Sequence, residues 1–120
     1  MKAKSAAVNM VQPRFRVLCG KDIAMGPGKA ELLEQVGKAG SIAEGAKSMG
    51  MSYMRAWTLI KTMQRCFKKP LLKVVRGGAR HGGAELTATG RQALLLYRQM
   101  ERTSLLASKS AWQKMLKLMA

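Results

Sequence analysis

The residues that decide the fold run from 41 to 67 and read SIAEGAKSMGMSYMRAWTLIKTMQRCF. Ser41 and Glu44 have the spacing of a capping box, in which the serine hydroxyl accepts from the third backbone N–H and the glutamate reaches back. The short helix that follows closes at Gly50, because glycine permits the left-handed backbone of a tight turn. Ser52 can cap a second, longer helix. The stretch therefore predicts two helices joined by a short turn.

The second predicted helix, which Pro70 ends, has one apolar and one polar side. Its apolar residues recur at i, i+3, i+4 and i+7, and they are Tyr53, Ala56, Trp57, Ile60, Met63 and Phe67. The opposite side carries Arg55, Thr58, Lys61, Thr62 and Arg65. A helix-turn-helix has this form, and its second helix places its N-terminal end in the major groove, where Ser52, Tyr53, Arg55 and Thr58 can reach base edges. An ordinary helical hairpin with a solvated basic face fits the same pattern, so both interpretations stay open here.

Flanking segments add a strand and a helix before this pair. Residues 14–19 alternate polar and apolar, which predicts a short strand that ends at Gly20. Pro27 suits the first turn of a helix with apolar residues at helical spacing, and Gly40 provides its stop.

A glycine-rich hairpin is expected after the second helix. Residues 72–76 and 84–87 can form its two strands, with GGARHGG between them. No Gly-Lys-Ser/Thr follows the loop, which disfavours a nucleotide cradle. A basic two-stranded wing is a recurring addition to a helix-turn-helix, and its charges over phosphate or minor groove would be Lys73, Arg76, Arg80 and His81.

The C-terminal residues 91–120 contain no helix breaker. A helix that Thr87 or Thr89 caps could run roughly 45 Å there, at 1.5 Å per residue. Its apolar residues fall on two faces: Ala93, Leu96, Tyr97, Met100, Ala107 and Ala111 on one, and Leu95, Leu105, Leu106, Trp112, Leu116 and Met119 on the other. Such a helix must be buried on two sides. We expect the chain's own domain to cover one side and a second copy the other; the alternative is a helix packed wholly inside one domain. The expected dimer interface is Leu96, Met100, Leu106, Trp112 and Leu116.

Charge separates the possible functions. Lys and Arg number 22 against 6 Asp and Glu, so the net charge is +16 in 120 residues. A polyanionic partner offsets the self-repulsion of such a chain. One His and six scattered carboxylates offer little material for a catalytic or metal site, which argues against an enzyme. Cys19 and Cys66 lack metal-site spacing, and we interpret them as two buried thiols rather than a bridge.

The segmental charge is uneven, and no targeting segment is evident. Residues 52–70 carry five positive and no negative side chains, whereas residues 27–51 carry three of each. No stretch has the apolar length of a secretory signal or a membrane span. We expect a cytoplasmic, nucleoid-associated protein without a membrane partner. Its predicted organisation is a flexible segment at 1–12, a winged helix-turn-helix at 13–90 and a long C-terminal dimerisation helix at 91–120.

Three motifs in order resemble the DNA-binding domain of the ModE family, molybdate-responsive transcription factors related in their winged helix to LysR-type regulators. The motifs are GSIAEGAK at 40–47, MSYMRAW at 51–57, and GG at 77–78 followed by GGAELTATG at 82–90. The resemblance covers roughly residues 14–107. It implies a mainly α fold with a small β hairpin, a winged helix-turn-helix dimerised through the long C-terminal helix, with Ser41, Ser52, Tyr53, Arg55 and the wing near DNA. With the other basic and polar side chains, the expected DNA-contacting set is Ser41, Lys47, Ser52, Tyr53, Arg55, Thr58, Lys61, Lys73, Arg76, Arg80 and His81.

The resemblance does not extend to molybdate binding. Full-length family members continue into molybdate-binding domains, and the sequence to Ala120 has neither their residues nor their length. We therefore expect no cofactor, and any oxyanion response would need a separate oxyanion-binding protein or another part of a longer gene product. The leading hypothesis is a sequence-specific transcriptional regulator that binds a palindromic operator in double-stranded DNA as a homodimer. The alternative is a basic protein that binds nucleic acid without sequence preference, such as a nucleoid or RNA-associated factor.

Overall fold

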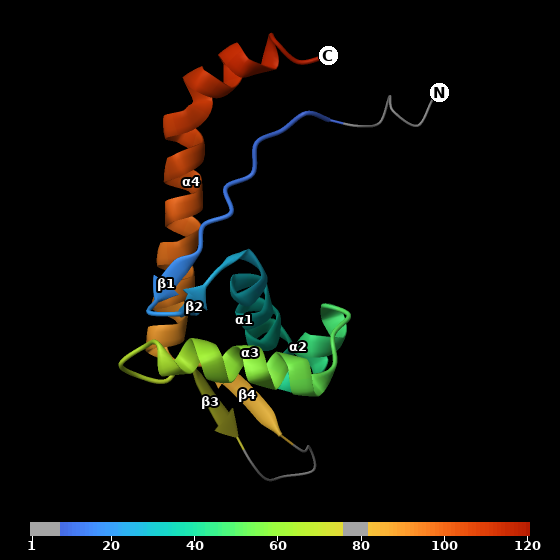
Figure 1. Cartoon of the computed structure of the whole chain (residues 1–120). Helices are drawn as coiled ribbons and strands as arrows, with labels where there is room; N and C mark the ends of the chain where they lie inside the picture. Colours follow the sequence, from blue (N-terminus) through green and yellow to red (C-terminus); the bar gives the residue numbers. More distant parts are fainter. Residues whose placement is uncertain (1–7, 76–81) are drawn as a thin grey trace.

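The computed structural model describes residues 8–75 and 82–120, which form a helical unit with two small hairpins and one long projecting helix (Figure 1). Each hairpin is a two-stranded antiparallel sheet. This architecture is a winged helix-turn-helix, as predicted. In chain order the elements are β1 (Val17–Cys19), β2 (Asp22–Met25), α1 (Pro27–Ala39), α2 (Ile42–Ser48), α3 (Tyr53–Arg65), β3 (Leu72–Val75), β4 (Gly83–Leu86) and α4 (Ala88–Leu116).

The core lies where α1, α2, α3, the β3–β4 hairpin and the start of α4 meet. Apolar side chains at helical spacing supply it, as expected from burial of one stripe per helix. The largest fully buried side chains are Leu32, Leu33, Val36, Ile60, Met63 and Leu71. No charged or polar residue is fully buried within the described part of the chain. The polar side chains therefore remain available at the surface of this small unit.

The N-terminal hairpin differs from the expectation. The predicted strand at 14–19 is shorter, because only Val17–Cys19 pairs, and its partner β2 was not predicted. Ala24 and Met25 of β2 are both buried against the helices. β2 is short and lacks polar–apolar alternation, so its sequence carries no strand signal of the usual kind.

Helix α3 ends earlier than predicted, at Arg65 rather than near Pro70. The Gln64 side-chain oxygen accepts hydrogen bonds from the backbone N–H groups of Leu71 and Leu72, at 2.8 and 3.0 Å. These bonds hold the returning chain against α3 and allow Leu71 to enter the core. Side-chain bonds to the returning chain therefore accompany the end of the helix at Arg65. Pro70 lies beyond that end and does not determine it.

Helix α4 begins at the predicted cap. The Thr87 hydroxyl accepts from Gly90 N–H at 2.9 Å and donates to the Pro70 carbonyl oxygen at 2.6 Å. Gly90 is needed here, because an added Cβ would collide with the Leu71 carbonyl group. The helix then leaves the core and runs beside the N-terminal segment (Figure 1).

Only one side of α4 is covered by the chain itself. Leu96 and Met100, which belong to the expected dimer interface, are 50% and 39% exposed. The covered stripe contains Tyr97, whose hydroxyl donates to the Phe15 carbonyl oxygen at 2.9 Å. Its other fully or partly buried members are Ala93, Leu94, Arg98, Glu101, Ser104 and Trp112. Polar as well as apolar residues occupy this stripe. It therefore follows neither of the two predicted apolar faces, although Ala93 and Tyr97 belong to the first and Trp112 to the second.

Both cysteines are free, as expected, but the interpretation as two buried thiols is wrong. Cys19 is exposed on the short β1 strand, and Cys66 is half-buried just after α3. The pKa of the Cys66 thiol is raised, chiefly by partial burial and to a smaller extent by a hydrogen bond with Cys19. No helix within the described residues combines the length and apolar character needed to cross a membrane.

Candidate nucleic-acid interface

The α2–turn–α3 unit has the local bonds that its sequence predicts. The hydroxyl groups of Ser41 and Ser52 accept from the N–H groups of Glu44 and Arg55, each at 3.1 Å. Gly50 has a φ of 67° in the turn between the helices, a conformation that favours glycine. The two caps and the turn together fix where α3 begins, which determines what its first turn presents to solvent.

A close crossing of α1 and α2 supports this unit from behind. A Cβ on Gly45 would lie 2.6 Å from Val36 Cγ2 and 2.9 Å from Val36 Cα. Contacts that short essentially require glycine, because the obstructing atoms include backbone. Gly45, in the middle of α2, therefore has a specific packing role.

The outermost line of α3 consists of Met54, Thr58, Lys61 and Arg65, all exposed and spaced at i, i+4, i+7 and i+11. This spacing places them on one side of a helix with 3.6 residues per turn. Met54 is 67% exposed, and sequence reasoning did not place it among the DNA-contacting residues. The sequence signal for Met54 was its position in the first turn of this helix, opposite Ala56 and Ile60. An apolar tip in this line can contact a thymine methyl group.

Thr58 has a geometry suited to accepting hydrogen bonds. Its hydroxyl donates to the Met54 carbonyl oxygen at 2.9 Å. Since that proton is used inside the helix, the hydroxyl oxygen presents its remaining acceptor capacity outward. The exposed amino groups of adenine and cytosine in the major groove are donors of the matching kind.

One flank of α3 faces the β3–β4 hairpin. Tyr53 and Trp57 line a hollow of about 820 Å³ between the helix and Val74 of the hairpin. Tyr53 is 50% exposed and lies outside the core, so the predicted apolar side does not include it. Trp57 is half-buried and packs against the core. Ala84 N–H donates to the Gly40 carbonyl oxygen at 2.8 Å. This bond ties the hairpin to the helical unit and holds it beside α3.

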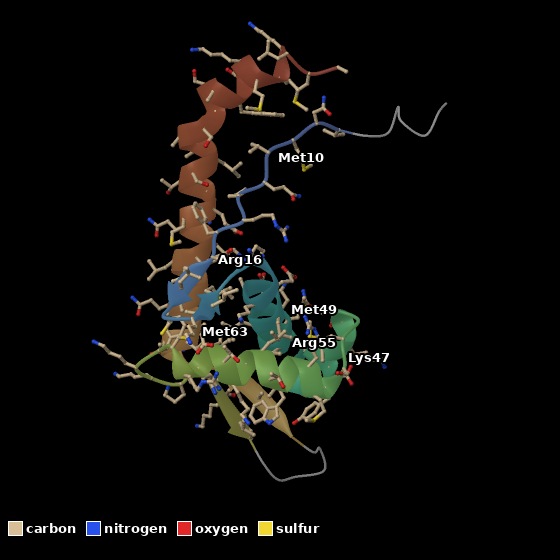
Figure 2. The ribbon with its side chains drawn as sticks, viewed as in Figure 1. Met10, Arg16, Lys47, Met49, Arg55 and Met63 are labelled. Atoms are coloured by element: carbon tan, nitrogen blue, oxygen red, sulfur yellow. The ribbon has the colours of Figure 1, made fainter. Side chains whose placement is uncertain are left out.

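The other flank of α3 faces the start of α1. Arg55 lies on this flank (Figure 2), whereas the prediction placed it directly opposite the buried stripe. It lines a hollow of about 290 Å³ with Arg14, Arg16, Lys29 and the Gly26–Gly28 segment. The approach of these N-terminal arginines to α3 was not predicted, because they are far away in sequence.

Carboxylates gather on a different side of the molecule. Arg98 of α4 forms ion pairs with Glu34 at 2.7 Å, Glu101 at 3.1 Å and Glu31 at 3.3 Å. The hydrogen bond from Arg98 lowers the pKa of Glu34, although partial burial opposes the shift. The α1–α4 seam thus takes up three of the six acidic residues, and α3 itself contains none.

The remaining predicted DNA-contacting residues are dispersed around these flanks. Lys47 is exposed near the end of α2, and Ser41 is half-buried at its start. Lys73 is exposed on β3 and pairs in register with Glu85 of β4. Arg76, Arg80 and His81 lie outside the described residues. Among the residues that are described, no group of three His, Cys, Asp or Glu side chains could hold a metal ion.

The predicted dimer residues are mostly at the surface. Leu106 is 75% exposed, Leu96 is 50% exposed, and Met100 and Leu116 are each 39% exposed. Trp112 is half-buried on the covered side of α4. Four of the five therefore remain accessible to a second protein surface.

Curated proteins with clear similarity to the chain include the following three. The molybdenum transport protein ModE of Azotobacter vinelandii is 38% identical over 78 residues, which cover 65% of this chain and 29% of that protein. The transcriptional regulator ModE of Haemophilus influenzae is 36% identical over 77 residues, covering 64% of this chain and 30% of that protein. The DNA-binding transcriptional dual regulator ModE of Escherichia coli K12 is 38% identical over 71 residues, covering 59% and 27%.

The chain spans less than a third of the length of these relatives. No family profile matches it. Each relative nevertheless shares more than a third of its aligned residues with the chain. The resemblance to the ModE family is therefore confirmed, and it holds for 59–65% of this chain.

Proposed function

We propose that this chain is a DNA-binding transcriptional regulator and not an enzyme, and that it reads a specific sequence through α3. The observation that carries the proposal is the exposed face of α3, which has no carboxylate. Two serine caps fix where α2 and α3 begin, and the Ala84–Gly40 backbone bond holds the hairpin beside α3. A net charge of +16 supplies the attraction to a polyanion. The similarity to proteins named as ModE transcriptional regulators supports the same function.

The proposed roles divide along the chain. Residues 13–90 form the DNA-binding unit, and residues 91–120 form the dimerisation helix, with 1–12 outside both. The exposed leucines of α4 support this division, because a soluble unit rarely leaves such an apolar row uncovered. Two copies related by a two-fold axis would present two recognition helices roughly 34 Å apart, which fits a palindromic operator. Its place in the cell would be the cytoplasmic nucleoid.

Selection of bound duplexes from a random DNA pool tests the function directly. A regulator should enrich one palindromic motif and bind it roughly 10³-fold or more tightly than random DNA at the same salt concentration. The alternative, non-specific binding to nucleic acid, predicts no enriched motif and equal affinity for all duplexes. Salt dependence alone does not discriminate, because phosphate contacts dominate both modes.

Replacement of Arg55 by Ala separates base reading from phosphate binding within α3. As a base reader, Arg55→Ala should weaken operator binding by about 1–3 kcal/mol and relax the preference at one base position. Lys69→Ala, in the exposed turn after α3, is the matched control and should weaken all duplexes about equally. Equal losses on operator and random DNA for Arg55→Ala would assign Arg55 to the phosphates.

A further inference from the structure

A basic cluster, defined here as Arg14, Arg16 and Lys29, lies beside α3 on the side away from the hairpin. Together with Arg55 it lines the hollow of about 290 Å³ at the start of α1. Two of its members come from the N-terminal segment and one from the first turn of α1. Three separate parts of the chain thus converge there once α3 is included.

Most of the positive charge of the basic cluster is not paired with a carboxylate in the described residues. Neither Arg16 nor Lys29 forms an ion pair with any residue in the described ranges 8–75 and 82–120. Arg14 differs, because it also lines a second hollow, of about 370 Å³, with Glu31 and Glu101. The two carboxylates of α1, Glu31 and Glu34, form ion pairs with Arg98. Arg16 and Lys29 therefore carry most of the uncompensated charge.

The arrangement around α3 is two-sided. Figure 2 shows Arg16 and Arg55 on one side of α3 and the β3–β4 hairpin on the other. A helix seated in the major groove, which is about 12 Å wide, has a sugar–phosphate backbone along each of its flanks. We propose that the basic cluster is a second DNA-backbone clamp, which grips phosphates on the strand opposite the one that the hairpin approaches. This inference rests on the proposed function of α3.

The form of the hollow favours a DNA phosphate over a free phosphate ion. The arginines at its edge are exposed and Lys29 is only half-buried, so water screens each contact and a single small anion gains little. A polymer that presents successive phosphates benefits from several weak contacts at once, because each neutralised phosphate releases a counterion. The start of α1 also offers backbone N–H groups, and no acidic side chain occupies its first turn.

The test is the salt dependence of binding by the full chain, measured on the selected operator and on random DNA. The double variant Arg16→Ala/Lys29→Ala should reduce the slope of log K against log salt by about 2, since each phosphate contributes about 0.9. The loss should be equal on both duplexes. The matched control is Lys109→Ala/Lys117→Ala, which removes the same charge from the distal part of α4 and should change the slope much less. A further double variant, Arg16→Gln/Lys29→Gln, removes the same charge but keeps polar side chains, and it should reduce the slope equally. Circular dichroism should show unchanged helix content in the Ala, Gln and control double variants.

Phosphate ethylation interference locates the contacts. In the wild-type chain, ethylation should inhibit binding on both sides of the groove that α3 occupies, and the Arg16/Lys29 variant should lose inhibition on one side only. Equal slopes for the cluster variant and the α4 control would overturn the clamp while leaving the proposed function intact. Saturable binding of inorganic phosphate to the cluster at fixed ionic strength would also overturn it, in favour of a free-anion site. A wild-type chain that binds no DNA would remove both proposals.

Discussion

Helices α3 and α4 begin in the same way but expose different kinds of side chain. Both begin at a hydroxyl cap, Ser52 for α3 and Thr87 for α4. In α3 the buried stripe is fully used, with Ala56, Ile60 and Met63 at 0% exposure, and the rest of the helix is mainly polar and basic. In α4 a single residue with a large side chain, Tyr97, is fully buried.

The uncovered part of α4 carries large exposed apolar side chains among its polar and basic ones. Leu95 and Leu106 are 63% and 75% exposed and lie on one side of the helix, away from the core. An exposed basic face gains free energy from a polyanion, whereas an exposed apolar face gains it from another apolar surface. The two helices therefore expose different kinds of side chain, and each kind indicates a different kind of partner.

Placing charge on the apolar face of α4 should have the largest effect. The double variant Leu106→Asp/Leu116→Asp should dissociate the proposed dimer and reduce operator affinity toward that for random DNA, a loss of roughly 10³-fold. Sedimentation and operator titration measure the two consequences. Lys21→Asp, in the turn between β1 and β2, makes the same change in net charge and should leave the dimer intact. A wild-type chain that is monomeric at high micromolar concentration, yet binds its operator tightly, would contradict the role given to α4.

Gly45→Ala should have a smaller effect, confined to the helix-turn-helix half. The added Cβ collides with Val36, including its backbone, so α1 and α2 must shift apart. Overpacking of this kind destabilises by about 1–3 kcal/mol. Gly28→Ala is the matched control in the first turn of α1, where nothing lies within 4 Å of the new Cβ, and it should leave stability unchanged or slightly raised. Chemical denaturation measures both, and equal midpoints would show that the crossing can relax.

The smallest effect is expected at Arg98, where the covered part of α4 meets α1. Arg98→Ala should lower the free energy of unfolding by about 1–2 kcal/mol near neutral pH, because charge-assisted hydrogen bonds to Glu34 and Glu101 are lost. Since the folded-state pKa of Glu34 is lowered, its contribution is present above the unfolded pKa and disappears as pH falls through the folded one. The difference between wild type and variant should therefore shrink in acid. Urea titrations at several pH values below 5 test this, and a difference that grows on acidification would contradict the ion-pair account.

Local signals in the sequence predicted the elements best. The caps at Ser41 and Ser52, the stop at Gly40 and the cap at Thr87 all depend on residues within three or four positions of one another. Such short-range bonds are readable from the chain alone. The end of α3 was predicted too late, at Pro70, because Gln64 binds residues seven and eight positions away. The strand β2 was not predicted, because it is defined by its partner.

The candidate interface likewise has residues whose placement the sequence predicts and residues whose placement it does not. Exposed positions such as Thr58 and Lys61 follow from helical spacing, and the structure brings them into one line with Met54 and Arg65. Which flank of α3 receives Arg55, and which N-terminal side chains join it there, depends on how β1, β2 and α1 fold back. No spacing rule in the sequence records that approach.

The sequence by itself determined the helix-turn-helix, the basic exposed face of its second helix and the long final helix, because caps, glycine turns and 3.6-residue periodicity are local properties. Only the tertiary structure decided which side of α4 is covered, since Tyr97 reaches the Phe15 carbonyl oxygen across 82 positions of sequence. It likewise decided that Arg16 and Lys29 stand beside α3. Contacts between distant segments depend on how the whole core packs, and the pattern of any one segment does not contain that information.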